Sequence, residues 1–105
     1  VRTAEITYAA RDSDFDGFAI KEGDYLALLE HQLFGTDRDL GDLLERLAKS
    51  EALQSAEFIS IFYGEDVTEA QAQQAADQFT AACPNAEVNL LPGGQPVYYY
   101  MISAE

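Results

Sequence analysis

Short apolar runs separated by turn-forming residues predict a sheet of about six strands. The runs are bounded by Gly, Asp, Asn or Pro, which interrupt regular structure. Runs with strand character cover residues 4–10, 18–20, 25–29, 32–34, 58–63, 87–91 and 97–102. Residues 11–17 are polar and are predicted to form a loop. Glu30-His31 is a predicted hairpin turn, although it lacks the favoured Asn-Gly pair.

Two segments have the apolar spacing of helices. The first is predicted to begin at Asp37 or Asp39, and its stripe consists of Leu40, Leu43, Leu44 and Leu47. The second runs from about Thr68 to Cys83 and opens with the capping-box pair Thr68 and Gln71. Small residues around one Phe form its predicted buried stripe, namely Ala72, Ala75, Ala76, Phe79, Ala82 and Cys83. Residues 51–56 are predicted to link the first helix to the next strand.

Residues 57–103 organise the predicted sheet. Residues 58–63 are apolar on both faces of a strand except at Ser60, which predicts burial on both sides. The successive strand, helix and strand predict a right-handed parallel crossover. After the turn Pro92-Gly93-Gly94-Gln95-Pro96, the last strand is expected to return antiparallel to its neighbour. The predicted fold class is α/β (α+β), a two-layer sandwich in which a mixed sheet carries two helices.

The last predicted strand is unusual because it contains three consecutive tyrosines. Strict alternation divides it into two faces, one with Val97, Tyr99 and Met101 and the other with Tyr98, Tyr100 and Ile102. A sheet with helices on one side leaves one of these sets exposed, and exposed Tyr and Met are typical of protein contacts. Burial of both sets, by loops or by other domains of a parent protein, is an open alternative.

Composition narrows the functional classes. Nineteen acidic and six basic residues give a formal net charge of −13 over 105 residues, and this charge opposes binding to nucleic acid or anionic membranes. The length predicts a single domain, residues 1–105, with one core. The absence of an apolar run of roughly 20 residues, together with the single Cys83, favours a cytoplasmic protein. Because Val1-Arg2-Thr3 leads directly into a strand, we expect a fragment of a longer multidomain protein.

Catalytic and phosphate-binding groups are scarce. One His and one Cys cannot form a structural zinc cluster, and His31 and Cys83 lack the spacing of a catalytic dyad. Gly64-Glu65-Asp66 precedes a helix, where phosphates often bind. Its two acids would repel an anion and suit the helix dipole, so a capping and turn role is favoured.

One acidic segment begins with the spacing of a calcium-binding loop. Its carboxylates are Asp12, Asp14, Asp16 and Glu22. Gly17 matches the sixth position of such a loop, but Gly23 occupies the twelfth, where Glu is needed. A solvated acidic loop is therefore the favoured interpretation, and we expect no catalytic, cofactor or metal site in this chain.

Four blocks of sequence resemble a known module, and they occur in the expected order along nearly the whole chain. They are Tyr8-Ala9-Ala10-Arg11-Asp12-Ser13, Ile20-Lys21-Glu22-Gly23-Asp24, Ile61-Phe62-Tyr63-Gly64-Glu65-Asp66-Val67-Thr68 and Gly93-Gly94-Gln95-Pro96-Val97-Tyr98. The chain resembles the C-terminal domain of bacterial dihydroxyacetone-kinase-like proteins, the ATP-binding subunit of fatty acid kinase. Such domains are also labelled "DAK phosphatase" or DegV-like. Tyr99 departs from the family pattern, which usually has Pro there, and Glu30-His31 replaces an Asp-Gly-like turn.

The resemblance implies a non-catalytic role. In this family ATP and magnesium belong to an N-terminal domain, and the C-terminal domain is implicated in engaging a separate DegV-like fatty-acid-binding protein. The acyl carboxylate bound by that partner is phosphorylated. We therefore hypothesise that Gln95, Tyr98, Tyr99 and Tyr100 contact the partner. Two alternatives stay open: a domain that itself binds a small molecule or lipid, and a structural domain that dimerises or braces its parent.

Overall fold

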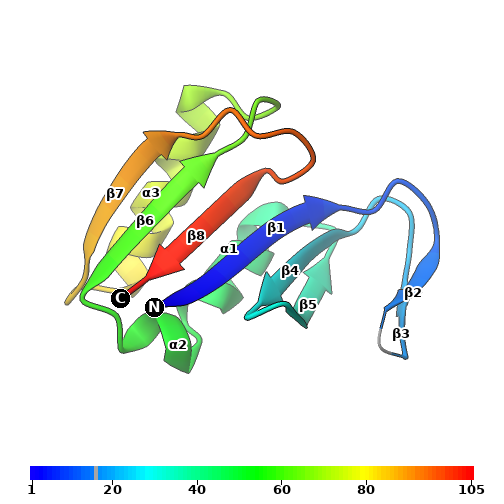
Figure 1. Cartoon of the computed structure of the whole chain (residues 1–105), viewed down its shortest axis with the longest axis horizontal. Coiled ribbons are helices and arrows are strands. Elements are labelled where there is room, and N and C mark those ends of the chain that lie inside the picture. Colours follow the sequence, from blue (N-terminus) through cyan, green and yellow to red (C-terminus); the bar gives the residue numbers. More distant parts are fainter. Residues whose placement is uncertain (16) are drawn as a thin grey trace.

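The computed structural model describes residues 1–15 and 17–105, and it shows a six-stranded mixed sheet in the order β5-β4-β1-β8-β6-β7 (Figure 1). The strands of this sheet are β1 Arg2–Tyr8, β4 Tyr25–Leu29, β5 Gln32–Asp37, β6 Phe58–Tyr63, β7 Glu87–Pro92 and β8 Tyr100–Ala104. The helices are α1 Leu40–Ala48, α2 Glu51–Gln54 and α3 Glu69–Ala82. A separate two-stranded sheet is made by β2 Ser13–Phe15 and β3 Phe18–Ile20. The predicted two-layer mixed fold is confirmed.

Strand β8 joins the two halves of the sheet. Strands β1, β4 and β5 pair antiparallel, whereas β6 and β7 are parallel neighbours connected through α3. The predicted parallel crossover is thus confirmed. Strand β8 is antiparallel to both β1 and β6 and lies between them. Its neighbours are therefore not β7, the strand that precedes it in the chain.

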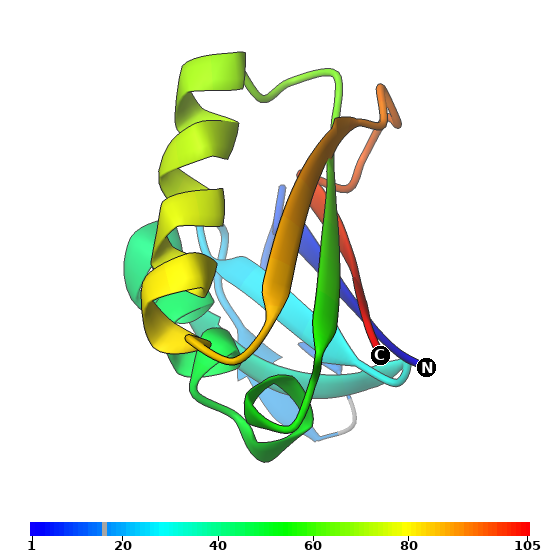
Figure 2. The same ribbon diagram turned by 90° about the vertical axis from the view of Figure 1, so that its left-hand side faces the viewer.

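The two longer helices begin at capped N-termini. The Asp39 side chain caps α1 by accepting from the Asp42 amide at 3.1 Å, while Asp37 ends β5 instead. Thr68 and Gln71 form the predicted capping box of α3, with bonds of 3.1 and 3.2 Å. Both helices pack on one face of the sheet, and within the described residues no helix covers the other face, called here the open face (Figure 2).

The core lies between these helices and the sheet. Both predicted helix stripes supply it, although Leu40 and Ala82 are only partly buried. The residues at its centre that are less than 2% exposed include Leu43, Leu47, Phe79, Ile6, Ile59 and Ile61. Fully burying such a side chain stabilises the fold by roughly 1.5–3 kcal/mol. No helix in the described ranges is long and apolar enough to cross a bilayer.

The expectation that β6 is buried on both faces is wrong. Ile59 and Ile61 are fully buried under the helices, but Phe58 and Phe62 point to the open face and are exposed. The strand lies between two others, yet a central position shields only its edges. Burial of a strand on both sides requires helices on both faces of the sheet, and here they cover one.

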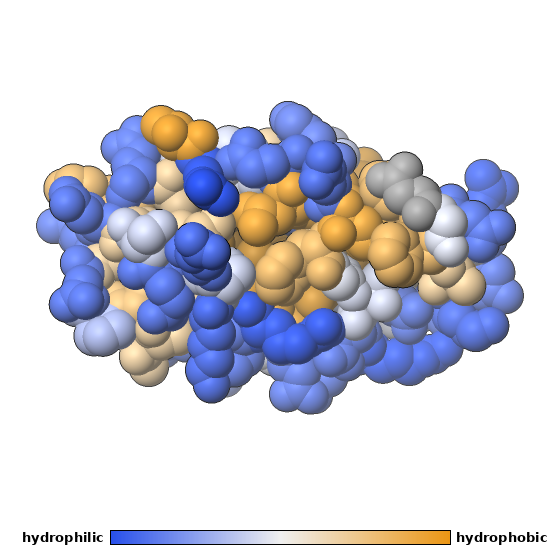
Figure 3. Space-filling view, turned by 90° about the horizontal axis from the view of Figure 1, so that it is seen from below, coloured by the Kyte–Doolittle hydropathy of each residue, from blue (hydrophilic) through white to orange (hydrophobic). Residues whose placement is uncertain are grey.

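Part of the open face is covered by the β2–β3 hairpin. Ala9, Ile20 and Leu26 form a second buried cluster, with Phe15 and Leu33 packed against it. Seen from below, hydrophobic side chains gather in the middle of the molecule between hydrophilic margins (Figure 3). The hairpin also corrects the prediction of a continuous loop at residues 11–17, because Ser13, among others, pairs with β3.

Other boundaries differ from the predicted ones. The linker at residues 51–56 contains the short helix α2, whose Ala52 and Leu53 are buried. The last strand begins at Tyr100 rather than Val97. The Glu30-His31 turn exists as predicted, and both residues adopt positive φ, 53° and 65°. Such angles suit a tight hairpin turn but are normally taken by Asn or Gly.

Candidate functional site

Residues 93–99 form a loop, called here the 93–99 loop, that is fastened to the end of β6. The amides of Gly93 and Gly94 both donate to the carbonyl oxygen of Tyr63, at 2.9 and 3.0 Å. Gly94 has a φ of 66°, which glycine adopts without steric cost. The predicted turn therefore does not lead straight into a strand, because it first turns back along the sheet.

Gly64 gives this loop the space that it needs. Its amide donates to the carbonyl oxygen of Tyr99 at 2.8 Å. A Cβ atom at Gly64 would overlap the carbonyl oxygen of Tyr98 and would lie 2.8 Å from that of Gln95. The two sequence blocks that carried the family resemblance are thus in direct backbone contact.

The side chain of Gln95 holds the loop from inside. Its Nε2 donates to the carbonyl oxygens of Phe62, at 3.0 Å, and Tyr98, at 3.2 Å. Gln95 is half-buried and its amide nitrogen is engaged within the chain. Among the predicted contact residues, Gln95 thus shapes the loop.

Val97 is the strained point of the loop. Its φ of 73° is uncommon for a β-branched residue, and the Tyr98 amide donates to the Pro96 carbonyl at 2.8 Å, as in a γ-turn. The Val97 carbonyl in turn accepts from the Thr7 hydroxyl at 3.1 Å. The Val97 side chain is 68% exposed, so the strained backbone presents an apolar group to solvent.

The three consecutive tyrosines have different environments. Tyr98 is half-buried in the loop, whereas Tyr100 begins β8 and is only 2% exposed. Burial raises the pKa of Tyr100 to about 12, and its hydroxyl lies 3.4 Å from the Gln71 carbonyl. The predicted shared face of Tyr98 and Tyr100 is wrong because the strand starts after Tyr99, and Tyr99 and Tyr100 line the same cleft.

Tyr99 belongs to an aromatic cluster that the sequence did not reveal. Its ring centroid lies 5.7 Å from that of Tyr25 and 6.5 Å from that of Tyr8, and the rings of Tyr8 and Tyr25 are 5.6 Å apart. Its amide donates to the Ile6 carbonyl at 2.8 Å, which continues the β1–β8 pairing past the end of the strand. Offset aromatic pairs at these distances are stabilising.

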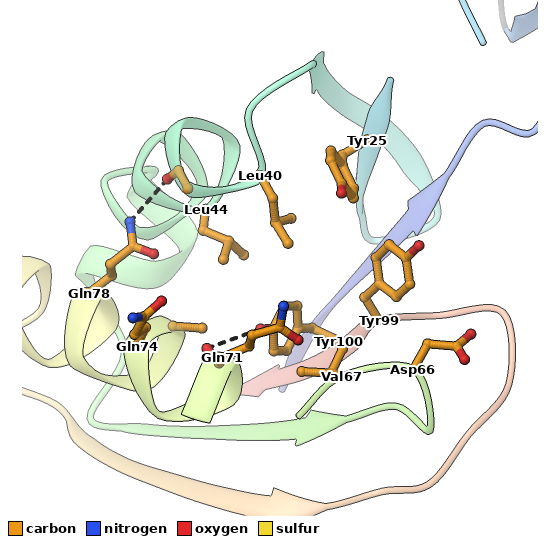
Figure 4. A pocket seen from close by; sticks show the side chains of 12 residues that line it. Tyr25, Leu40, Leu44, Asp66, Val67, Gln71, Gln74, Gln78, Tyr99 and Tyr100 are labelled. Atoms are coloured by element: carbon orange, nitrogen blue, oxygen red, sulfur yellow. Dashed lines mark hydrogen bonds between the residues drawn. The ribbon is translucent and has the colours of Figure 1, made fainter. Parts of the chain in front are cut away.

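This aromatic cluster forms one side of a cleft of about 340 Å³. Tyr25 and Tyr99 lie on one side and the glutamines of α3 on the other, with leucines of α1 nearby (Figure 4). The lining residues are Tyr25, Leu40, Gly41, Leu44, Asp66, Val67, Gln71, Gln74, Ala75, Gln78, Tyr99 and Tyr100. The cleft therefore combines aromatic rings, an apolar floor, amide groups and one carboxylate.

The potential in the cleft is negative. Burial raises the pKa of Tyr99, and the nearby Tyr25, Asp66 and Tyr8 raise it further. Asp66 is exposed, and the structure shows no ion pair to it within residues 1–15 and 17–105. The cap of α3 is Thr68, so Asp66 is not the capping group.

A second surface feature lies on the open face. Leu91, Phe62 and Met101 are directly opposite one another on β7, β6 and β8, and they are called here the apolar row. Their exposed fractions are 40%, 37% and 39%. The alternation of these strands indicated which residues share a face, but it could not show that this face lacks helices.

The acidic segment and the lone thiol are not brought together. Asp12 Oδ1 accepts from the Glu22 amide at 2.8 Å, whereas Asp16 lies outside the described residues. The described part of the chain contains no group of three His, Cys, Asp or Glu placed to hold a metal ion. His31 is exposed beside Glu5, whereas Cys83 is buried and burial raises its thiol pKa.

Comparison with known proteins gives one family. Residues 1–105 match the FakA-like C-terminal domain family, whose members resemble the C-terminal part of the A-type subunit of fatty acid kinase. The chain is 30% identical over its full length to Protein YloV of Bacillus subtilis, 30% to uncharacterized protein SH1689 of Staphylococcus haemolyticus and 28% to uncharacterized protein SAUSA300_1119 of Staphylococcus aureus. It spans 19% of the length of each of these relatives. This chain belongs to the FakA-like family of fatty acid kinase C-terminal domains.

Proposed function

We propose that this chain is a non-catalytic partner-recognition domain of a cytoplasmic fatty acid kinase. In this proposal it engages a DegV-like fatty-acid-binding protein. An ATP- and magnesium-binding domain elsewhere in a longer parent protein then phosphorylates the acyl carboxylate that the partner holds. Membership of the family supports the kinase-subunit part of the proposal.

The apolar row supports the recognition part. Three apolar side chains in register on neighbouring strands are exposed on a chain that otherwise carries a net charge of −13. Contiguous exposed apolar residues with a polar surround are typical of protein contact sites. The row is the observation that carries this proposal.

The 93–99 loop borders the row and fixes its upper end. Gln95 bonds to the Phe62 carbonyl, and Gly93 lies against the Phe62 side chain, since a Cβ there would be 3.1 Å from the Phe62 Cβ. In the proposed contact Tyr98 and Val97 extend the row. Tyr99 and Tyr100 act from below, by holding the start of β8 in place.

The test is calorimetric titration of the 105-residue chain with the acyl-loaded partner. Replacing Phe62→Ser together with Met101→Ser is expected to weaken binding at least about tenfold, because two exposed anchors are lost. Ser60→Ala with Ser103→Ala is the matched control, since these residues face each other on the same strands and the same face. If both double variants bind as well as the unmodified chain, the row is not the contact.

The same variants test the alternative of dimerisation. Sedimentation of the chain alone shows whether it self-associates. A dimer that is lost in the Phe62→Ser, Met101→Ser variant, without any affinity for the acyl-binding protein, would assign the apolar row to a homodimer instead.

A further inference from the structure

We propose that the cleft between α1, α3 and the tyrosine cluster binds an organic cation, an alkylammonium or guanidinium group carried on a short apolar stem. This site is separate from the apolar row. The row lies on the open face, whereas the cleft lies on the side of the sheet that carries the helices (Figures 2 and 4). The cation site therefore does not depend on the proposed recognition role.

The size and place of the cleft suit a small ligand or a single long side chain. Its volume of about 340 Å³ lies at the lower end of the range for small-molecule pockets. Asp66 and Val67 follow the end of β6 and precede α3. Ligands of open α/β sheets bind outside the carboxyl ends of parallel strands, where one strand leads into a helix.

The charge of the cleft selects a cation. Asp66 is the only charged residue among the described residues that line it. The basic side chains on the adjoining elements already face other carboxylates, because Lys49 lies 3.3 Å from Glu45 and Arg38 lies 3.5 Å from Asp24. The Asp66 carboxylate is therefore available to a ligand, and the net charge of −13 adds long-range attraction for cations.

The aromatic side of the cleft adds to this preference. The rings of Tyr25 and Tyr99 are inclined at 52° with centroids 5.7 Å apart. A cation within about 6 Å of a tyrosine ring face is attracted by the ring quadrupole, and ammonium ligands are commonly held by several such rings. Together with Asp66, the two rings provide an incomplete aromatic cage with a carboxylate at its side (Figure 4).

The remaining lining groups suit the stem and the donors of such a ligand. Leu40, Leu44 and Val67 provide an apolar floor for methylene groups. The Gln78 Nε2 donates to the Gly41 carbonyl at 3.0 Å, which leaves its amide oxygen to accept a hydrogen bond. Ammonium and guanidinium groups carry only donors, and this oxygen is complementary to them.

The experiment is an NMR titration of the amide-labelled 105-residue chain with n-butylammonium and n-butylguanidinium. We expect dissociation constants on the order of millimolar, with shift changes centred on Tyr25, Asp66 and Tyr99. n-Butanol and butanoate have the same stem without the positive charge and are expected to bind at least about tenfold more weakly. Equal binding of either control ligand, or shift changes centred elsewhere, would overturn the proposal.

Matched variants separate the carboxylate from general surface charge. Asp66→Asn is expected to weaken cation binding about tenfold, whereas Glu65→Gln, which changes the net charge equally at the neighbouring position, is expected to leave it within about twofold. Tyr25→Leu and Tyr99→Leu, each checked for native shift dispersion, are expected to weaken it severalfold. Equal affinity of Asp66→Asn and Glu65→Gln would contradict the assignment.

A last arm distinguishes the two sources of such a cation. The probe is a capped Gly-Lys-Gly tripeptide, compared with n-butylammonium under the same conditions. Tighter binding of the tripeptide would assign the site to a basic side chain of a polypeptide, and tighter binding of n-butylammonium would assign it to a free amine. Either result supports a cation site, and binding of neither one overturns it.

Discussion

Gly64 lies so close to the carbonyl oxygen of Tyr98 that a side chain at this position would overlap it. This approach connects the end of β6 with the 93–99 loop, and the loop in turn borders both the apolar row and the cleft. A change of backbone position at either residue therefore has to be matched by a change at the other.

Gly64→Ala is expected to destabilise the chain by about 2–3 kcal/mol, because the Cβ meets backbone oxygens that cannot move independently. The measurement is urea unfolding followed by circular dichroism. Gly94→Ala is the control, since no atom lies within 4 Å of its Cβ and only the positive φ costs energy, about 1 kcal/mol. An equal loss in both variants would show that the backbones do not approach so closely.

Tyr100→Phe is expected to make the fold more resistant to alkali. The folded pKa of Tyr100, about 12, lies above the ordinary value of 10, so the stability that its burial contributes is fully present below pH 10 and is lost as the pH rises to 12. The lost contribution amounts to about 3 kcal/mol at most. Phenylalanine cannot ionise and keeps the packing of the ring.

The measurement for Tyr100→Phe is the free energy of unfolding between pH 9 and 12, together with tyrosine absorbance. The variant should lose the last tyrosine to titrate and should show a flatter decline in stability. Tyr98→Phe, at a half-buried residue of the loop, is the comparison. If the two variants have the same pH profile, Tyr100 is not the buried group.

His31→Gly is expected to raise the free energy of unfolding by about 0.5–1 kcal/mol. His31 has a φ of 65° in the hairpin turn, an angle that costs residues with a Cβ about 1–2 kcal/mol, and the higher unfolded-state entropy of Gly offsets part of the gain. The substitution also removes the interaction of the exposed imidazole with Glu5, 3.4 Å away. His31→Ala removes the same imidazole without relieving φ, so it should not stabilise; thermal unfolding compares the two.

Thr68→Ala is expected to cost about 1 kcal/mol, because it opens the capping box of α3. Thr80→Ala lies inside the same helix, where alanine is the better helix former, and should be neutral or slightly stabilising. Chemical unfolding of both variants checks the difference. A neutral Thr68→Ala would mean that tertiary packing alone fixes the start of α3.

Local features of the fold could be predicted from the sequence. The capping box at Thr68, the parallel crossover around α3 and strand β4 are encoded by residues within a few positions of one another. The central place of β8 depends on pairing with β1, whose residues lie nearly 100 positions earlier. Alternation within a single strand contains no information about that choice.

The candidate site was harder to predict for the same reason. Tyr8, Tyr25 and Tyr99 meet only because β1, β4 and β8 are neighbours in the sheet. Their sequence signal, aromatic residues at strand ends, is shared with ordinary core positions. The exposure of Phe62 depends on where the helices pack, and the apolar pattern of β6 does not specify this.

The position of β8 also affects how the chain folds during synthesis. In the described residues, β8 provides all strand pairing between the β1–β4–β5 half and the β6–β7 half. Until residue 104 has left the ribosome, a nascent chain therefore has two part-sheets, each with an unsatisfied edge that another nascent chain could join. Completion of the domain is expected to be post-translational, and a stalled or truncated product that lacks β8 would be a substrate for chaperones and proteases.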